Sequence, residues 1–464
     1  MNTTVKQNKM AVMPMGKLVF SMSLPLMISL LVQSLYNIVD GIFVARISED
    51  AFTATSLAYP VQILMVAVSV GTGVGVNALI SRKIGAKQYE EANQAATTGL
   101  ILSLLCTLLF MFLGIFCTKS FVRLFTDDAV TAGLCESYLR ICMIFCLGIF
   151  TETLAQRLLQ ATGNTFLSMI SLVVGALTNI ILDPIMIFGL FGCPAMGIRG
   201  AAIATVIGQW LGAIVAFALN YFKNPEIHFV FQNYRLTIAS VLAIYKVGFP
   251  TIIMQAMGCI MISTINAILM PFSSTAVAFF GAYYKLQNFL MMPINGLGQA
   301  AIPIVGYNYG AKNGTRITQA LKTMLPAAIC IALFGTLIFM LFPAQLLHLF
   351  AASDAMLAIG VPALRIISVT FVLSAVTTIL GYSASGLGNG VTNMLGTAIR
   401  QFILLVPLVY LFAANGGVDK IWYALWISEG AAVIYCIVSI RQEFHKKVNP
   451  LCTDATQKEK AMQI

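Results

Sequence analysis

Long apolar stretches alternate with short polar and charged clusters along almost the whole of this 464-residue chain. Each apolar stretch has about 20 residues, the length that an α-helix needs to cross the hydrocarbon core of a bilayer. The pattern therefore predicts an all-α integral membrane protein with twelve transmembrane helices, six in each half of the chain. They are expected near residues 17–44, 53–80, 94–116, 134–157, 166–190, 198–221, 242–268, 276–305, 318–341, 359–383, 395–414 and 420–440.

Composition agrees with a chain embedded in a lipid bilayer. Apolar residues make up 59% of the sequence, charged residues only 9%, and the mean hydropathy is +0.89. A soluble domain carries about 25% charged residues. The first apolar run is interpreted as a retained span rather than a signal peptide, because no small-residue cleavage site follows a short apolar core.

Two copies of one segment lie end to end in the chain. Pro25 pairs with Pro250, an offset of 250 − 25 = 225. Membrane transporters are often built from two such halves around a central site. We therefore expect an N-terminal six-helix lobe with an ion-coupling site at 1–221, a cytoplasmic linker at 222–241, a C-terminal six-helix lobe at 242–440 and a cytoplasmic tail at 441–464. The offset also joins Gly71 to Gly296, Gly73 to Gly298, Gly85-Ala86-Lys87 to Gly310-Ala311-Lys312, Arg140 to Arg365, and Gly163-Asn164 to Gly388-Asn389.

The positive charges indicate how the chain is oriented. Of the 27 lysine and arginine residues, 18 fall in segments on the side of the N-terminus and five on the opposite side. Cytoplasmic loops carry such an excess, so both termini are expected in the cytoplasm. The net charge of +10 is then a topology signal. It predicts no nucleic-acid partner, because no basic stripe is interleaved with aromatic residues on a soluble face.

No motif for an enzyme, a disulfide framework or a structural metal is visible. The ten cysteines include no CxxC pair, and only three histidines occur. A nucleophile elbow, a Walker loop and a zinc signature are missing. The run from Gly71 to Gly75 resembles a phosphate loop, but it lies inside an apolar span, so we interpret it as a close helix contact. We expect no enzymatic activity and no cofactor.

The first span carries a polar stripe that ends in a carboxylate. Gln33, Tyr36, Asn37 and Asp40 occur at i, i+3, i+4 and i+7, so they share one helical face. The rest of this helix is apolar. A charge inside the bilayer is costly and usually functional, and it needs a partner or a water-filled cavity.

The fifth span carries a second acid. Asn179 and Asp183 are one turn apart, and Pro184 follows, which frees a backbone carbonyl near Ile180 and marks a point of helix bending. Both this span and the first run outward, which places Asp40 and Asp183 at one level, on the order of 10 Å from the outer surface. Two such carboxylates cannot both stay ionised cheaply, so a proton or a monovalent cation should bind. The alternative is a buried structural hydrogen-bond network.

Only the first half has these acids, since Asp40 aligns with Ile265 and Asp183 with Leu408. The second half has other ionisable residues inside spans, namely Lys285, Arg400 and Glu429. A Lys or Arg paired with Glu429 would be a structural pair. Glu152 and Arg157 could also pair, although their spacing of five is imperfect. We assign to a central substrate cavity Gln33, Gln62, Gln255, Tyr283, Lys285, Gln287 and Asn288.

At this point the chain resembles the bacterial branch of the multidrug and toxic compound extrusion (MATE) transporters, from roughly residue 17 to 440. The resemblance rests on the Gln33–Asp40 segment, the Gly85-Ala86-Lys87 triplet, the Gln160–Asn164 segment and the Asn179–Pro184 segment. It implies two six-helix lobes in a V shape in the bacterial cytoplasmic membrane. It also implies a cation site, for H⁺ or Na⁺, at Asp40, Asn179 and Asp183, with Tyr36 and Asn37 alongside. Gln156 stands near a position where many members have Asn. The acids that some branches use in the seventh and tenth spans are missing, which argues against a cation site in the C-terminal lobe.

The function predicted from these features is secondary antiport. Small organic compounds, amphipathic and often cationic, are exported while H⁺ or Na⁺ moves inward, and a two-lobed chain can do this as a monomer. A flippase for lipid-linked oligosaccharides is one alternative, although it would favour more cationic residues in the cavity. Export of an endogenous metabolite is another. A non-transporting membrane protein is disfavoured by the missing catalytic residues and soluble domain.

Overall fold

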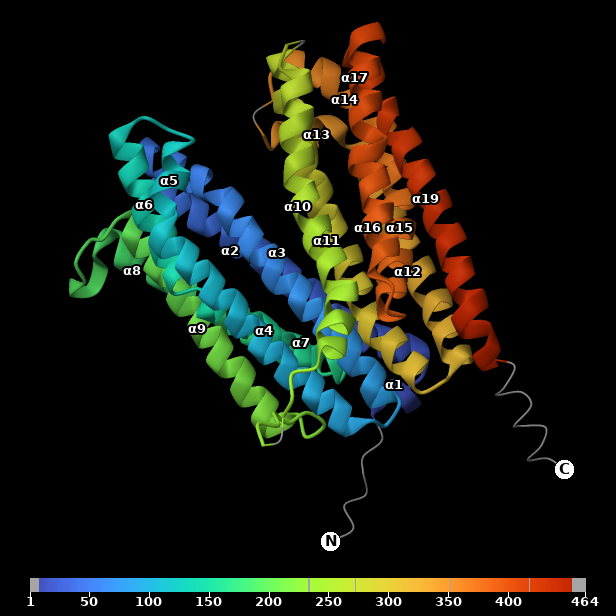
Figure 1. Cartoon of the computed structure of the whole chain (residues 1–464). Helices are drawn as coiled ribbons and strands as arrows, with labels where there is room; N and C mark the ends of the chain where they lie inside the picture. The colour runs from blue at the N-terminus through green and yellow to red at the C-terminus, as the bar shows by residue number, and fades with distance from the viewer. Residues whose placement is uncertain (1–7, 233, 272, 351, 417, 453–464) are drawn as a thin grey trace, which may run out of the picture. The chain divides into compact units, whose positions relative to one another are not determined.

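The computed structural model of the chain is all-α, as the sequence predicts (Figure 1). It describes residues 8–232, 234–271, 273–350, 352–416 and 418–452. No β-strand occurs among these residues.

The first half of the chain contains nine α-helices within its described residues and one 3₁₀ turn at Leu190–Gly192. The helices are α1 (Lys9–Val12), α2 (Met15–Ala45), α3 (Glu49–Gly85), α4 (Tyr89–Phe116), α5 (Thr118–Arg123), α6 (Ala129–Ile144), α7 (Leu147–Ala161), α8 (Thr165–Phe188) and α9 (Ile198–Lys223).

The second half contains the remaining helices. They are α10 (Ile238–Leu269), α11 (Ser274–Gly310), α12 (Gly314–Leu341), α13 (Pro343–His348), α14 (Asp354–Ser368), α15 (Thr370–Gly386), α16 (Gly390–Ala398), α17 (Leu405–Gly416), α18 (Val418–Ile421) and α19 (Tyr423–Glu443). Two π-helical segments, Ile399–Ile403 and Phe444–Val448, extend α16 and α19.

Up to twelve membrane spans follow from the described elements. In the part of the chain that the structure describes, ten helical stretches are long and apolar enough to cross a membrane. Two further spans are bent pairs, α6 with α7 at 46° and α14 with α15 at 45°. A tryptophan indole donates a hydrogen bond to a backbone carbonyl near each bend, Trp210 to Phe145 (3.2 Å) and Trp426 to Ile366 (2.7 Å). Such donors satisfy carbonyl groups that a bend frees from the helical ladder.

The chain divides into two compact units. Residues 28–84 and 88–252 form one, called here the N-unit, and the remaining described residues form the C-unit. The predicted lobe boundaries differ from this division, because α2 up to Met27 belongs to the C-unit and α10 up to Ile252 to the N-unit. Each boundary lies two residues after a repeat-equivalent proline, Pro25 or Pro250. A proline inside a helix removes a backbone hydrogen bond, so both helices divide at a weak point.

The repeat found in the sequence is also present in the backbone. Lys87 and Lys312, at the offset of 225, both adopt the left-handed conformation, with φ of 60° and 57°. Gly163 and Gly388, at the same offset, have φ of 89° and 83°. The left-handed region is costly for side chains other than glycine, so its recurrence at equivalent positions shows that both halves have the same turns.

The glycine-rich run in α3 makes close helix contacts, as the sequence predicts. A Cβ atom added to Gly75 would lie 2.2 Å from the Ile244 carbonyl oxygen, and one on Gly73 would lie 2.8 Å from Arg157 Cγ. Gly298, the equivalent of Gly73, packs against Tyr382, the equivalent of Arg157. Glycine therefore lets the same pair of helices approach closely in each unit.

Candidate functional site

The acid of the fifth span lies in the interior of the N-unit. Asn179 and Asp183 of α8 are 3% and 0% exposed. The Asn179 amide donates to Asp183 Oδ1 (3.2 Å) and to the hydroxyl of Thr205 on α9 (3.3 Å). The helix runs unbroken through Pro184 and ends at Gly189, which takes a left-handed conformation. Neighbouring helices therefore fix the orientation of the amide that contacts the carboxylate.

Helices α2 and α8 are neighbours at their C-terminal ends. The rings of Phe43 and Phe188 meet edge to face with centroids 6.3 Å apart. One turn before Phe43, the carboxyl groups of Asp40 and Asp183 lie within hydrogen-bonding reach of each other. The structure thus brings together two acids that are 143 positions apart in the sequence (183 − 40).

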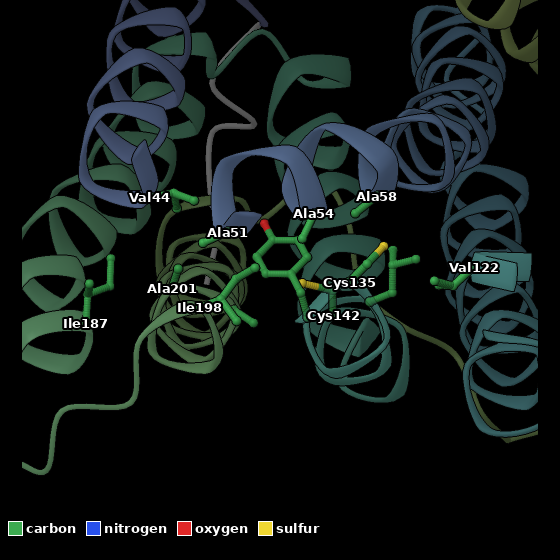
Figure 2. Close-up of a cluster of buried hydrophobic side chains, with 13 residues drawn as sticks. Val44, Ala51, Ala54, Ala58, Val122, Cys135, Cys142, Ile187, Ile198 and Ala201 are labelled. Atoms are coloured by element: carbon green, nitrogen blue, oxygen red, sulfur yellow. The ribbon is translucent and has the colours of Figure 1, made fainter. Parts of the chain in front are cut away.

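A hydrophobic cluster holds the two acid-bearing helices at the same level (Figure 2). Val44 follows Asp40 by one turn, and Ile187 follows Asp183 by one turn, and both belong to this cluster. Helices in a bilayer associate through close packing of this kind, so sliding of α2 along α8 would disrupt these contacts. The buried members are Val44, Ala51, Ala54, Ala58, Val122, Cys135, Tyr138, Leu139, Cys142, Ile187, Ile198, Ala201 and Ala202.

Three buried oxygen atoms in this site lack a hydrogen-bond partner among the described residues. They are Asp40 Oδ1, Asn179 Oδ1 and Asp183 Oδ2. A buried acceptor without a partner is costly, and most such groups in proteins are satisfied. Carboxylate, amide and hydroxyl oxygens are ligands for a hard cation, and two neighbouring carboxylates can share a proton. The residues present therefore fit either ion.

A third acid, Glu152 of α7, lies near this site. Tyr36 of α2 interacts electrostatically with Glu152, Asp40 and Asp183. The amide of Gln156 donates to Glu152 Oε1 (3.1 Å). The pairing of Glu152 with Arg157 that the sequence allowed is not among the ion pairs of the described residues, and Arg157 donates to Gln160 (2.8 Å).

Glycines make room for the Glu152 carboxylate. A Cβ atom on Gly212 of α9 would lie 2.3 Å from Glu152 Oε1, and one on Gly175 of α8 would lie 3.3 Å from it. The carboxylate therefore occupies a niche where α7, α8 and α9 meet, and Figure 1 shows α7 and α9 side by side.

The other residues predicted on the N-terminal side have different surroundings. Gln33 is half-buried, and Asn37 is exposed. The Gln62 amide donates to the hydroxyl of Tyr138 (2.9 Å), a member of the hydrophobic cluster. That bond joins α3 to α6.

In the C-unit, the residues assigned to a substrate cavity divide by exposure. Gln255, Lys285 and Asn288 are exposed, and Gln287 is half-buried. Tyr283 is buried, 1% exposed, between the rings of Phe279 and Phe280. A Lys or Arg partner was expected for Glu429, and Arg400 takes that place, with its Nη1 3.7 Å from Glu429 Oε1.

Among the residues that the structure describes, neither a cluster of metal-binding side chains nor a disulfide bond is found. No group of three or more His, Cys, Asp or Glu side chains there is placed to hold a metal ion. No disulfide joins the cysteines that the structure describes.

Comparison with known proteins identifies relatives along nearly the whole chain. The MatE family model matches residues 25–185 and, a second time, residues 250–411. The multidrug export protein MepA of Staphylococcus haemolyticus (strain JCSC1435) is 25% identical over 418 residues, which are 89% of this chain and 90% of that protein. Solved structures also resemble the chain, and two of them serve as examples. The structure of MATE in complex with MaL6 has a TM-score of 0.89 and 25% identity, and the match covers 97% of this chain and 100% of that one. The other, an outward-facing multidrug resistance MATE family transporter of the MOP superfamily, has a TM-score of 0.88 and 26% identity, over 96% and 99%.

Proposed function

Because this chain belongs to the MatE family of membrane transporters, we propose that it is a secondary antiporter. It exports amphipathic, often cationic, organic compounds in exchange for protons or sodium ions that move inward. The curated relatives that match over most of their length are named multidrug export proteins, which supports this class of substrate.

The observation that carries the proposal is the set of three unpartnered oxygens at Asp40, Asn179 and Asp183. A purely structural network would be expected to satisfy its own acceptors, since an unmet hydrogen bond costs about 1–3 kcal/mol. Oxygens left open between two acids favour a site that an ion enters and leaves.

The same geometry supports a coupling mechanism. With no ion bound, the negative site favours a cationic substrate in the membrane interior. An ion from outside neutralises Asp40 and Asp183 and removes that attraction. Binding of the ion shifts the population between conformations only as far as its affinities for them differ. Pro184 lies next to Asp183, so bending of α8 at this residue would alter the site directly.

We further propose that the chain lies in the bacterial cytoplasmic membrane with both termini inside, as the excess of inner positive charge favours. One chain contains both repeats, so we propose that it works as a monomer.

The test is ethidium accumulation in drug-sensitive cells that express the wild-type chain, Asp40→Asn or Asp183→Asn. Wild type should lower accumulation, and each substitution should abolish that effect with normal membrane insertion, because the amide neither releases a proton nor carries the charge that holds a cation. Repeating the assay with a protonophore and then without Na⁺ identifies the coupling ion. Full export by both variants would refute the site, and unchanged accumulation with wild type would favour a different substrate.

A further inference from the structure

A second polar site lies inside the C-unit, at the eleventh and twelfth spans. Its charged members are Arg400, in the π-helical segment Ile399–Ile403, and Glu429 of α19. The side chain of Arg400 is 22% exposed and that of Glu429 only 6%. A molecule that approaches this pair therefore meets the guanidinium first.

The ion pair between them is loose. Arg400 Nη1 and Glu429 Oε1 are 3.7 Å apart, whereas charge-assisted N–H···O hydrogen bonds are about 2.7–2.9 Å long. Glu429 Oε1 instead accepts a hydrogen bond of 2.6 Å from the buried hydroxyl of Ser374. The guanidinium has five N–H donors in a planar fork, and no hydrogen bond from it to a described residue is found. The pair leaves Arg400 able to bind another anion.

A pair of neutral polar side chains, Tyr284 and Asn288, lies in the neighbourhood of Arg400. Tyr284 of α11 is within electrostatic range of Arg400, and its side chain is hydrogen-bonded to that of Asn288. Its hydroxyl also lies 3.9 Å from the position of a Cβ on Gly258 of α10. A charged group inside a membrane-spanning segment rarely faces lipid, so we expect the exposed part of Arg400 to face a polar space, as its polar neighbour Tyr284 favours.

The buried side of the site has two groups without partners among the described residues. The Tyr283 hydroxyl is buried and has no hydrogen bond, and the same is true of Glu429 Oε2. Tyr283 interacts electrostatically with both Glu429 and Arg400. The other titratable group within range is Cys436. Such unmet groups in a native interior call for an explanation, and a ligand that joins the network supplies one.

The local backbone is irregular at this point. The Leu404 N–H bonds to the carbonyl of Ile399, five residues earlier, instead of four. Such single π-helical turns occur frequently at functional sites.

The repeat shows that this charge arrangement differs between the units. Arg400 is the equivalent of Gly175, since 400 − 175 = 225. In the N-unit, Gly175 lies next to the carboxylate of Glu152, which has no basic partner described. In the C-unit an arginine occupies the equivalent position and lies beside Glu429. Both units therefore have an acid near this position, but only that of the C-unit has an arginine beside it.

From this geometry we propose that Arg400, with Tyr284 and Asn288, is a binding site for the carboxylate of anionic or zwitterionic amphiphiles, for which Glu429 is the counter-ion when no ligand is bound. The proposal rests on the export function proposed above and names the residues that would hold those of its substrates that carry a carboxylate. A single guanidinium with neutral donors matches a singly charged carboxylate. Pyrophosphate carries more charge and would call for several cations, so a lipid-linked sugar fits the site less well.

Binding to the purified full-length protein in detergent tests this with two matched dyes. Rhodamine 110 has a free carboxylate, and rhodamine 123 is its methyl ester. Fluorescence anisotropy should show that wild type binds both. Arg400→Gln should weaken rhodamine 110 by about tenfold or more, the effect of losing one hydrogen bond to a charged group, and should leave rhodamine 123 within about twofold. Arg365→Gln removes a charge from an exposed position of the same unit and should change neither.

Glu429→Gln gives a result that a structural role alone does not predict. It removes the carboxylate that competes for Arg400, so rhodamine 110 should bind more tightly than to wild type. If Arg400→Gln is unstable because it leaves Glu429 unpaired, the double substitution Arg400→Gln/Glu429→Gln keeps the test valid and should also lose rhodamine 110. Failure of wild type to bind rhodamine 110, or equal weakening of both dyes, would overturn the proposal. No ion gradient is needed, so the outcome is separate from that of the ethidium assay.

Discussion

Asp183 is fully buried, yet one of its carboxylate oxygens has no hydrogen-bond partner among the described residues. The side-chain NH₂ group of Asn179 has two N–H donors, and it directs one to Asp183 and the other to Thr205. The amide oxygen of Asn179 has no hydrogen-bond partner among the described residues. The Thr205 hydroxyl thus helps to fix the orientation of the amide beside Asp183, without being an acid itself.

Thr205→Val tests this positioning role. Valine has nearly the same shape but cannot accept the hydrogen bond, so Asn179 should lose its fixed orientation. Loss of one such bond is worth about 1 kcal/mol. Ethidium export should therefore fall about fivefold, with an unchanged amount of protein in the membrane. Thr205→Ser keeps the hydroxyl and should retain most of the activity. Equal activity of the valine and serine variants would contradict the role.

Neither Thr205 nor Glu152 could be assigned to the site from the sequence. The stripe from Gln33 to Asp40 and the pair of Asn179 with Asp183 are each visible as a spacing within one helix. Thr205 and Glu152 reach the site from α9 and α7, and their spacing does not show which neighbouring helix each faces. The amphipathic pattern gives the face of a helix, whereas the partner of that face depends on packing.

At the scale of elements, α7, α8 and α9 meet through small residues. Gly175 and Gly208 bring α8 and α9 close together, and Gly212 leaves space for Glu152. Small residues permit this approach in membrane proteins, where packing rather than exclusion of water drives helix association. The three-helix contact and the buried acid therefore depend on each other.

Gly212→Ala measures that dependence. The new methyl group would overlap Glu152 Oε1, and overpacking of this kind costs about 1–3 kcal/mol. The melting temperature of the purified protein should fall, and the double substitution Gly212→Ala/Glu152→Ala should recover most of the loss, because the overlapping carboxylate is removed. Gly133→Ala adds a methyl group where no atom lies within 4 Å and should have little effect. If the melting temperature of the double variant falls as far as that of Gly212→Ala, overlap with the Glu152 carboxylate is not the cause of the destabilisation.

At the scale of the molecule, the number of spans and the repeat were predictable because both are periodic along the sequence. The bends after Ile144 and Ser368 could not be predicted from the sequence, because neither has a proline at the break. A backbone carbonyl near each bend instead accepts a hydrogen bond from a tryptophan that is distant in the sequence. The division of α2 and α10 between the two compact units was likewise missed. Apolar length marks a helix that spans a bilayer, but it carries no information about the unit against which each half packs.

The direction in which substrate and ion are exchanged depends on how the whole chain is oriented in the membrane. Six spans in each half return the chain to the side where it began, and the positive charges favour the cytoplasm for that side. On this topology the turn between α8 and α9 is outside the cell, and it carries Cys193, which is exposed. A variant that keeps only this cysteine should react with a membrane-impermeant maleimide in intact cells. A matched variant with Lys223→Cys as its one cysteine, at the other end of α9, should react only after the cells are permeabilised. The reverse labelling would invert the chain and would place the acids of the N-unit near the cytoplasmic surface, from which an inward-moving ion could not enter them first.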